Sequence, residues 1–486
     1  MLYSMDLTVL NLAVPQLSLA LKPTASQLLW IVDIYGFFIA GSLITMGTLG
    51  DLIGRRKMLL IGGAFFAMAS ALAAFSNSAE MLIATRALQG MAGATLAPST
   101  LSLIRVLFKN PKQRVVAVGL WGTSFSVGGL FGPVIGGIFI ENFWWGSVFL
   151  INIPVMILLL IIGPYLLPEY KNPQAGKIDL ISVGLSLIAI LFIIFGLKKI
   201  AEVGFLLIPN LFILTGSVLV FLFIKRQGKL KYPLIDLNLF KNFTFNALIL
   251  TNCFTMFAIF GTFIFTSQYM QSVMGLSPLR AGFWSMAFSV GFVFSSLLSP
   301  LLATLVRPAF VMASGLILGA AGFLLVSTVS GPDDLVYLVL GSLIFSFGSS
   351  PVLLFTTNML INSAPAEKAG SAAAISETGN ELGGALGIAI LGSVGTFIYR
   401  QNFTKVLNPN LPTELKASML STLENALDAA RNSSLEISQQ LITQAETAFT
   451  AAFQSVMLVA AFILFLLSIL VLTKLRHVRL ESEHGE

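Results

Sequence analysis

Two acidic residues, Glu377 and Glu381, stand inside the apolar run 372–390, which is long enough to cross a bilayer. On a helix, residues four apart lie one above the other, with about 6 Å between their Cβ atoms. Desolvation and like charge both disfavour ionising two such buried carboxyl groups together. We therefore expect a coupled pair that can hold a proton or a cation.

A stripe of glycines shares this segment with the two acids. Gly379, Gly383 and Gly387 also repeat every four residues, but at about 100° per residue they fall about 200° away from the glutamates. Small residues at this spacing let neighbouring membrane helices approach closely. The glycine face is therefore predicted to pack on another helix, and the acidic face to point at a cavity.

Three more charged residues lie within predicted spans, where each costs about 2.5–3.5 kcal/mol on insertion scales. They are Asp6, Asp33 and Arg86. Asp33 and Arg86 both fall in the outer half of their spans, so we expect them to form an ion pair, either for transport or as a purely structural salt bridge. Asp6 falls near the midplane, without a local partner in the sequence.

The composition requires a membrane protein. Of the 486 residues, 56% are hydrophobic and 10% are charged, whereas ordinary soluble domains carry about 25% charged residues. The formal charge of +6 is explained by basic cytoplasmic loops, so no nucleic acid is expected as a partner. One cysteine, Cys253, and two histidines, His477 and His484, exclude a disulfide framework and argue against a metal site. No cofactor is expected.

Apolar runs of about 17–27 residues predict an all-α integral membrane protein with fourteen transmembrane helices. The spans begin near Met1, Trp30, Met58, Met81, Val115, Phe149, Ile178, Leu207, Thr244, Leu279, Ala309, Leu335, Ala373 and Thr447. The heaviest basic clusters, at 55–57, 105–114 and 225–241, fall on connections that this count assigns to one side. The positive-inside bias places those connections and both termini in the cytoplasm.

The spans divide into two bundles and an insertion. We expect an N-terminal six-helix bundle (1–168), an inserted transmembrane hairpin without intramembrane charge (169–225), and a C-terminal six-helix bundle (226–486), with the linker at 225–242. Within the polar external stretch 401–446, four apolar residues have helical spacing: Leu415, Met419, Leu423 and Leu427. They predict an amphipathic helical hairpin on the outer surface, the alternative being a solvated loop without a role.

Two glycine-rich segments carry further structure. The first, residues 47–57 (GTLGDLIGRRK), is predicted to form a tight cytoplasmic turn in which Asp51 caps the third helix. The second, residues 128–137 (GGLFGPVIGG), predicts a kinked and closely packed fifth helix. The residues of interest in them are Gly47, Asp51, Gly54, Arg55, Arg56, Gly128, Gly132, Pro133, Gly136 and Gly137.

These segments resemble the motifs of the major facilitator superfamily. Residues 47–57 resemble its loop motif, residues 86–94 its fourth-helix motif, and residues 128–137 the fifth-helix motif associated with antiporters. Residues 6–15 (DLTVLNLAVP) look like the first-helix motif of the fourteen-helix drug:proton antiporter branch. Residues 29–35 and the stretch around the two glutamates resemble the corresponding segments of the quaternary-ammonium exporters in that branch.

The resemblance implies the major facilitator fold and a bacterial cytoplasmic-membrane monomer that exports small lipophilic cations, such as quaternary ammonium compounds and dyes, in exchange for protons. It carries over Asp6, Asp33, Arg86, Glu377 and Glu381 as proton- and substrate-coupling residues. It also carries over Asp51 and Arg55 as parts of a conformational latch. Export of another antibiotic or metabolite is an alternative. A lipid flippase or membrane enzyme is less well supported, since no catalytic cluster and no ATP-binding P-loop occurs.

Two departures from the family pattern lead to further expectations. The tenth span, 277–305, has no acid where some members carry one, and Val290 falls near that place, so we expect poorer handling of dications. Only five residues precede Asp6, so we expect an apolar segment upstream of Met1. Among the acids, we expect Glu381 and Asp6 to be indispensable and Glu377 to adjust affinity or stoichiometry.

Overall fold

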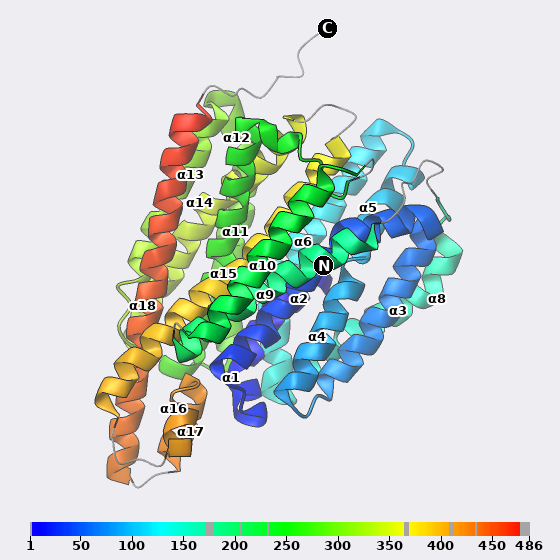
Figure 1. Ribbon diagram of the computed structural model, residues 1–486. Coiled ribbons are helices and arrows are strands. Elements are labelled where there is room, and N and C mark those ends of the chain that lie inside the picture. The colour runs from blue at the N-terminus through cyan, green and yellow to red at the C-terminus, as the bar shows by residue number, and fades with distance from the viewer. Residues whose placement is uncertain are drawn as a thin grey trace.

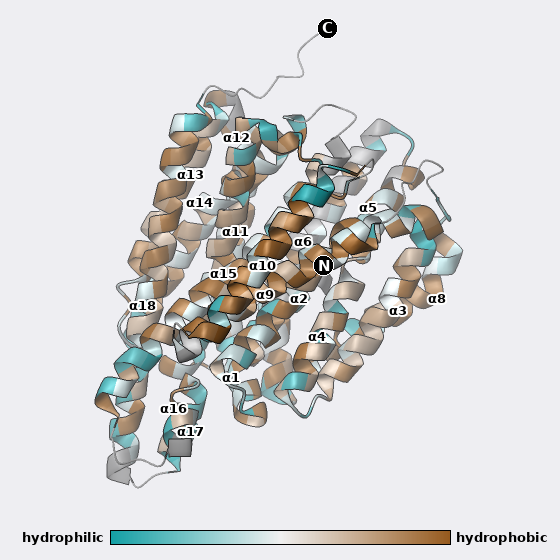
Figure 2. Cartoon of the chain, in the orientation of Figure 1, coloured by the Kyte–Doolittle hydropathy of each residue, from teal (hydrophilic) through white to brown (hydrophobic). Residues whose placement is uncertain are grey.

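The computed structural model describes residues 2–171, 179–204, 206–230, 233–363, 369–407, 413–432 and 435–476. Within these ranges the chain forms helices and short connections and contains no strand (Figure 1). Hydrophobic residues cover the long helices, and hydrophilic residues gather towards their ends (Figure 2). His477, His484 and part of the expected linker lie outside the described residues.

Eleven helical segments of the described chain are long and apolar enough to cross a membrane. The other three of the fourteen expected spans correspond to α1 (Leu2–Leu21), to α4 (Ala79–Gly93) followed by α5 (Leu96–Leu107), and to α6 (Pro111–Asn142). The all-helical membrane fold is confirmed, whereas the number fourteen stays a prediction.

The N-terminal part of the chain is completed by α2, α3, α7 and α8. These helices are α2 (Ala25–Ile53), α3 (Arg55–Ala74), α7 (Ser147–Leu150) and α8 (Asn152–Leu166). A capping box starts α2, because the Thr24 hydroxyl accepts from the Gln27 amide and the Gln27 side chain accepts from the Thr24 amide. The break between α4 and α5 precedes Pro98, which has no N–H for the carbonyl of residue 94.

The C-terminal part begins with a short helix at the end of the expected linker. Its helices are η1 (Leu239–Lys241), α11 (Phe243–Gln268), η2 (Tyr269–Val273), α12 (Pro278–Leu305), α13 (Pro308–Val326), η3 (Pro332–Asp334), α14 (Leu335–Asn362), α15 (Ala369–Val406), α16 (Thr413–Met419), α17 (Leu423–Arg431) and α18 (Leu435–Lys474). Helices α11, α13, α14, α15 and α18 pack on one another, and α12 packs on α14 and on α6.

Within the stretch expected to form an inserted hairpin lie α9 (Leu180–Val203) and α10 (Leu207–Gln227), which pack along each other. Helix α9 also contacts α2 and α15, one helix from each part of the chain (Figure 1). An apolar cluster fills this junction and includes Phe37 of α2, Ile194 of α9, and Ala385 and Ala389 of α15. The hairpin is therefore positioned to contribute side chains where the two parts meet.

The two parts are joined by polar contacts at the end of the molecule that carries α16 and α17 (Figure 1). There the Ser267 hydroxyl of α11 donates to the Asn11 carbonyl of α1 over 2.9 Å. The carboxylate of Glu141, at the end of α6, accepts from the Leu279 amide of α12 over 3.3 Å. Lys22 and Asp428 of α17 form an ion pair at 3.9 Å. The parts are thus closed against each other at this end, hereafter the α16–α17 end.

The polar stretch 401–446 is more divided than the amphipathic helical hairpin that its spacing predicts. It contains the end of α15, the short helices α16 and α17, and the start of α18. The chain breaks before Thr422, whose hydroxyl accepts from the Asn425 amide and caps α17. Met419, Leu423 and Leu427 are buried, so the amphipathic prediction holds for them. Residues 433–434 lie outside the described residues.

Candidate functional site

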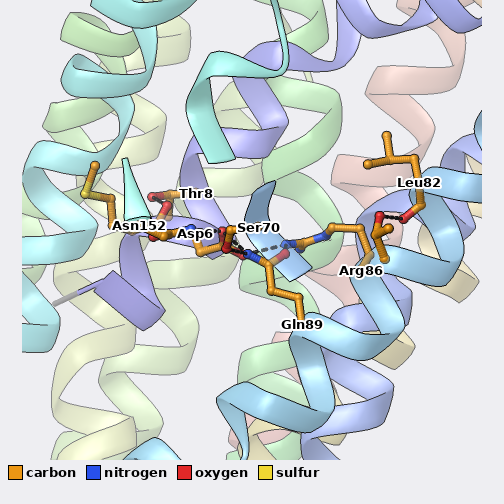
Figure 3. A network of polar contacts seen from close by, with 9 residues as sticks. Asp6, Thr8, Ser70, Leu82, Arg86, Gln89 and Asn152 are labelled. Carbon is orange, nitrogen blue, oxygen red and sulfur yellow. Dashed lines mark hydrogen bonds and ion pairs between the residues drawn. The ribbon is translucent and has the colours of Figure 1, made fainter. Parts of the chain in front are cut away.

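Asp6 lies at the centre of a buried polar network in the N-terminal part of the chain (Figure 3). Arg86 of α4 donates to Asp6 Oδ2 and forms an ion pair with it. Gln89, one turn further along α4, donates to Asp6 Oδ1 over 3.1 Å, and Asn152 of α8 donates to the same oxygen over 3.0 Å. Both carboxylate oxygens are thus held by side chains of neighbouring helices.

The same network fixes Arg86. Its Nη1 donates to Gln89 Oε1 over 2.7 Å, and Gln89 in turn donates to the Ser70 hydroxyl of α3 over 3.0 Å. The guanidinium carbon lies 4.4 Å from the centre of the Tyr35 ring, within the range of a cation–π contact. The predicted Asp33–Arg86 pair is therefore wrong, and so is the expectation that Asp6 lacks a partner. Arg86 pairs with Asp6.

Asp33 pairs instead with a lysine of the inserted hairpin. Lys198 Nζ of α9 lies 2.8 Å from Asp33 Oδ1 and 2.7 Å from Asp33 Oδ2. The same ammonium lies 3.7 Å from the centre of the Trp30 ring. Asp33 and Lys198 are 1% and 2% exposed, so the pair is sealed among helices α2, α9 and α15. The prediction of a hairpin without intramembrane charge is wrong, because Lys198 lies within the apolar segment Leu180–Ile200.

The two glutamates of α15 belong to a second polar group. Asn380 donates to Glu377 Oε2 over 3.3 Å and accepts from Asn252 of α11. Asn252 Oδ1 accepts from the Thr356 hydroxyl of α14 over 3.0 Å. Glu377 is therefore tied through neutral amides to two helices of the C-terminal part.

A small cavity connects Glu381 with Asp33. Its walls are Val32, Asp33 and Gly36 of α2, Phe260 of α11, and Asn380, Glu381, Gly384, Ala385 and Ile388 of α15. Acidic residues from both parts of the chain thus border one space, beside an aromatic ring. The cavity measures about 20 Å³, room for about one water molecule, so an organic cation fits only when the surrounding helices separate. In that opened state, carboxyl groups and an aromatic face are available to a cation.

The glycine stripe of α15 fixes the direction of these acids. A Cβ atom on Gly383 would lie 2.2 Å from the Cys253 carbonyl oxygen, and one on Gly387 would lie 2.1 Å from the Phe257 carbonyl oxygen. Both carbonyls belong to α11, so the two backbones are in direct contact and only glycine fits. The predicted close packing of the glycine face is confirmed, and Glu381 lines a cavity as expected.

The loop motif at 47–57 is mostly helical, contrary to the predicted turn. Helix α2 continues through Gly47 and Asp51 to Ile53, and only Gly54 separates it from α3. Gly54 has φ of 119°, a conformation that favours glycine, and a Cβ atom there would displace the Glu169 carboxylate, whose Oε1 would lie 2.4 Å away.

Asp51 does not cap α3 as predicted. It forms an ion pair with Arg55 at 2.6 Å, and Arg55 also donates to the Pro98 carbonyl over 3.4 Å. Glu169 takes the capping role, since its carboxylate accepts from the backbone amides of Arg56 and Lys57 over 3.1 Å and 3.2 Å. The motif is thereby tied to the end of α8, and its role as a latch stays a prediction.

The glycine segment of α6 packs the helix against both parts of the chain. Gly132 lies against Met5 and Thr8 of α1, and Gly136 against Val9. Gly137 lies against Leu279 of α12, and the carbonyl of Pro133 lies against Gly282 of the same helix. The close packing is confirmed; Gly128 and Gly129 precede this contact, and a hinge at Pro133 stays a prediction.

Three functional candidates were missed in the sequence. Lys198 stands at the end of an apolar run, where a lysine is expected to extend its ammonium group to the membrane surface. Glu169 lies in a connection without a recognisable spacing. Glu424 of α17 is 3% exposed and accepts from Gln268 over 3.4 Å and from the Ser272 hydroxyl over 3.2 Å. Burial raises the pKa of Glu424, and the two hydrogen bonds oppose this shift.

Comparison with known proteins gives a consistent picture. The family model described as Major Facilitator Superfamily matches residues 1–388. The multidrug efflux pump LfrA of Mycolicibacterium smegmatis is 36% identical over 461 residues, which cover 95% of this chain and 91% of that protein. The methyl viologen resistance protein SmvA of Salmonella typhimurium is 34% identical over 430 residues, covering 88% and 85%.

Solved structures resemble the chain in fold. A bacterial homologue of the human lysosomal transporter Spinster superposes with a TM-score of 0.67 at 17% identity and covers 97% of this chain and 95% of its own. The nucleoside transporter NupG superposes with a TM-score of 0.60 at 12% identity, covering 97% and 98%.

Proposed function

The chain belongs to the major facilitator superfamily of membrane transporters, and from this premise we propose that it exports lipophilic cations in exchange for protons. The proposed substrates are quaternary ammonium biocides and cationic dyes. The relatives named for multidrug efflux and methyl viologen resistance support transport of drugs out of the cell rather than into it. The chain is a transporter and not an enzyme.

The observation that carries the proposal is the cavity between α2, α11 and α15. It brings Asp33 and Glu381 to one space together with the ring of Phe260. In surroundings of low dielectric constant, an ionised carboxylate attracts a cation strongly, and an aromatic face adds to the attraction without requiring hydrogen-bond donors on the cargo. Protonation of the carboxylate removes the attraction, so proton binding and cargo binding oppose each other.

Proton stoichiometry decides how much energy such an exchange can use. One proton for one monovalent cation moves no net charge and draws only on the pH gradient, about 1.4 kcal/mol per unit. A second proton would add roughly 2.3 kcal/mol per 100 mV of membrane potential. Asp6, Glu377 and Glu381 offer titratable sites for this, and we propose that export of monovalent cations is electrogenic.

The topology proposed from the basic loops places both termini in the bacterial cytoplasm, which makes the α16–α17 end the outer end. The contacts of Asn11 with Ser267 and of Glu141 with Leu279 then close the transporter towards the outside. We further propose that a single chain, built from two six-helix bundles and the inserted hairpin, is the working unit.

Efflux of ethidium from everted membrane vesicles tests the function. Vesicles containing the protein should move the dye only while a proton gradient is present, and an uncoupler should stop the movement. Current measured in reconstituted membranes tests the stoichiometry, and zero current at a working transport rate would rule out the electrogenic form. Dye movement that is insensitive to the uncoupler would refute proton coupling.

Export of a different antibiotic or metabolite is the second candidate, supported by the 30% identity, over 394 residues, to the tetracenomycin C resistance and export protein of Streptomyces glaucescens. Competition separates the two, because a neutral drug that is the true cargo should slow ethidium efflux at lower concentration than a quaternary ammonium compound does. Monovalent cations are the first choice for the assay. Helix α12 carries Val290 near the place where some family members carry an acid, so we expect dications to be handled less well.

A further inference from the structure

The ammonium group of Lys198 makes the contacts that a cationic cargo would need. It lies within 2.8 Å of both carboxylate oxygens of Asp33 and 3.7 Å from the centre of the Trp30 ring. A carboxylate with an adjacent indole face is the combination that binds organic cations in apolar surroundings. In this structure the cation is part of the protein.

The position of Asp33 links this internal contact to the cargo cavity. Asp33 borders the cavity that Glu381 and Phe260 share, while its fully buried carboxylate lies against Lys198. A cargo cation that enters when the helices around the cavity separate therefore meets a carboxylate whose charge is already balanced. Full attraction by Asp33 and contact with the Trp30 ring are available only if Lys198 moves away.

We propose that Trp30 and Asp33 form a cation subsite that Lys198 occupies in the unloaded transporter, and that a monovalent lipophilic cation binds by displacing the Lys198 ammonium. The inference rests on the proposed export of cations and names the residues that select for charge. Neutral compounds cannot replace the ammonium opposite Asp33, so the subsite discriminates by charge and tolerates variation in shape.

The arrangement also spares the protein an unpaired buried charge. Removing one partner of a buried ion pair typically costs about 3–5 kcal/mol, because the other charge stays without compensation. With Lys198 on the hairpin and the cargo in the cavity as alternatives, Asp33 is neutralised both before and after loading. The inserted hairpin thereby becomes a competitor for the cargo, in addition to any structural role.

Equilibrium dialysis of tetraphenylphosphonium with the purified full-length protein tests the displacement. Lys198→Met removes the competitor and should tighten binding by about tenfold or more, as expected for removal of a close buried charge. Lys198→Arg should weaken binding, because a guanidinium binds a carboxylate through two parallel hydrogen bonds and stacks well on an indole. In the Lys198→Met background, Trp30→Leu should cancel most of the gain.

Lys199→Met serves as the matched control, since it removes the same charge from the next position of α9. It should leave the dissociation constant within about twofold of the unchanged protein. If Lys198→Met fails to fold, the weaker binding expected for Lys198→Arg decides the question by itself.

Equal affinity of the unchanged protein and every folded Lys198 variant would overturn the displacement while leaving cation export intact. Absence of tetraphenylphosphonium binding and of ethidium efflux in the unchanged protein would instead overturn the proposed function, and the inference with it.

Discussion

The two buried aspartates of the N-terminal part are neutralised in different ways. Asp6 is bound by Arg86, Gln89 and Asn152, which all come from its own part of the chain. Asp33 is bound by Lys198 of the inserted hairpin and lines a cavity at the boundary between the parts. One site is complete within a bundle, and the other depends on a helix outside it.

This difference predicts different responses to change. A carboxylate that is bound by several fixed partners does not exchange them easily for a ligand, because all of these hydrogen bonds must break together. A charge with one long and flexible partner beside a cavity can exchange that partner for a ligand. The Asp6 network is therefore expected to hold the bundle together, and the Asp33 pair to respond to cargo.

The largest effect is expected from Arg86→Met. It leaves Asp6 buried without its cation, which typically costs about 3–5 kcal/mol, so little folded protein should be recovered. The double variant Asp6→Asn with Arg86→Met removes both charges and should restore part of the yield without restoring transport. Size-exclusion chromatography of detergent extracts measures the yield.

Arg280→Met at the exposed start of α12 is the control for this experiment, because it removes an arginine without touching a buried acid. A full yield of folded Arg86→Met would show that the Asp6 network does not hold the bundle together.

Next in size is the loss of transport in Glu381→Gln. Glu381 shares the cavity with Asp33, so its carboxyl group is expected to be indispensable for exchange while the fold stays intact. Glu377→Gln should retain transport with altered affinity or stoichiometry, because Glu377 is tied to Asn380. Dye efflux from energised vesicles compares the two, and an active Glu381→Gln variant would contradict the assignment.

Double-mutant cycles on thermal stability sharpen the comparison further. Asp33→Asn and Lys198→Met should show a coupling free energy of about 0.5–3 kcal/mol, as residues in contact do. Asp33→Asn and Arg86→Gln should be additive, since the structure places the two residues in separate ion pairs. Coupling between Asp33 and Arg86 as large as that between Asp33 and Lys198 would remove the distinction between the sites.

The smallest effect concerns Glu424, a buried acid whose recorded partners, Gln268 and Ser272, are neutral. Burial raises its pKa, so at pH values between the ordinary and the raised pKa the docked α17 keeps a proton that an undocked segment loses. Docking is therefore most stable below the ordinary pKa of a glutamate and weakens as the pH rises through the raised value. Hydrogen exchange of residues 413–432 between about pH 4 and about pH 8 should show this loss of protection.

Glu424→Gln should make that protection independent of pH, because the amide does not titrate. Asp428→Asn, on the exposed side of the same helix, is the matched control and should keep the pH dependence. Identical pH profiles for the unchanged protein and Glu424→Gln would assign the effect to another group.

Hydropathy was enough to predict the long apolar helices, because each long apolar run must be a helix in a membrane; eleven of the expected spans are long and apolar enough to cross one. The glycine face of α15 was also predictable, since the period of a helix fixes which residues share a face. Gly383 and Gly387 do contact α11, and Glu381 does line a cavity.

The ion pairs could not be predicted, because depth in the membrane does not give direction around a helix. Asp33 and Arg86 lie at similar depth, and α2 does pack on α4. It is Tyr35, however, that contacts Arg86, and two residues along a helix turn the side chain by about 200°. Asp33 therefore faces α9, and only the packing of the hairpin shows that Lys198 turns inward.

The order of synthesis gives the Asp33–Lys198 pair a consequence for assembly. The two residues are 165 positions apart, so at about 5–20 residues per second the lysine leaves the ribosome roughly 8–33 s after the aspartate. During that interval α2 must enter the bilayer with a protonated Asp33 or wait beside the translocation channel. The hairpin then neutralises a helix that was made long before it, and a nascent chain released ahead of residue 198 carries an acid without its counter-charge.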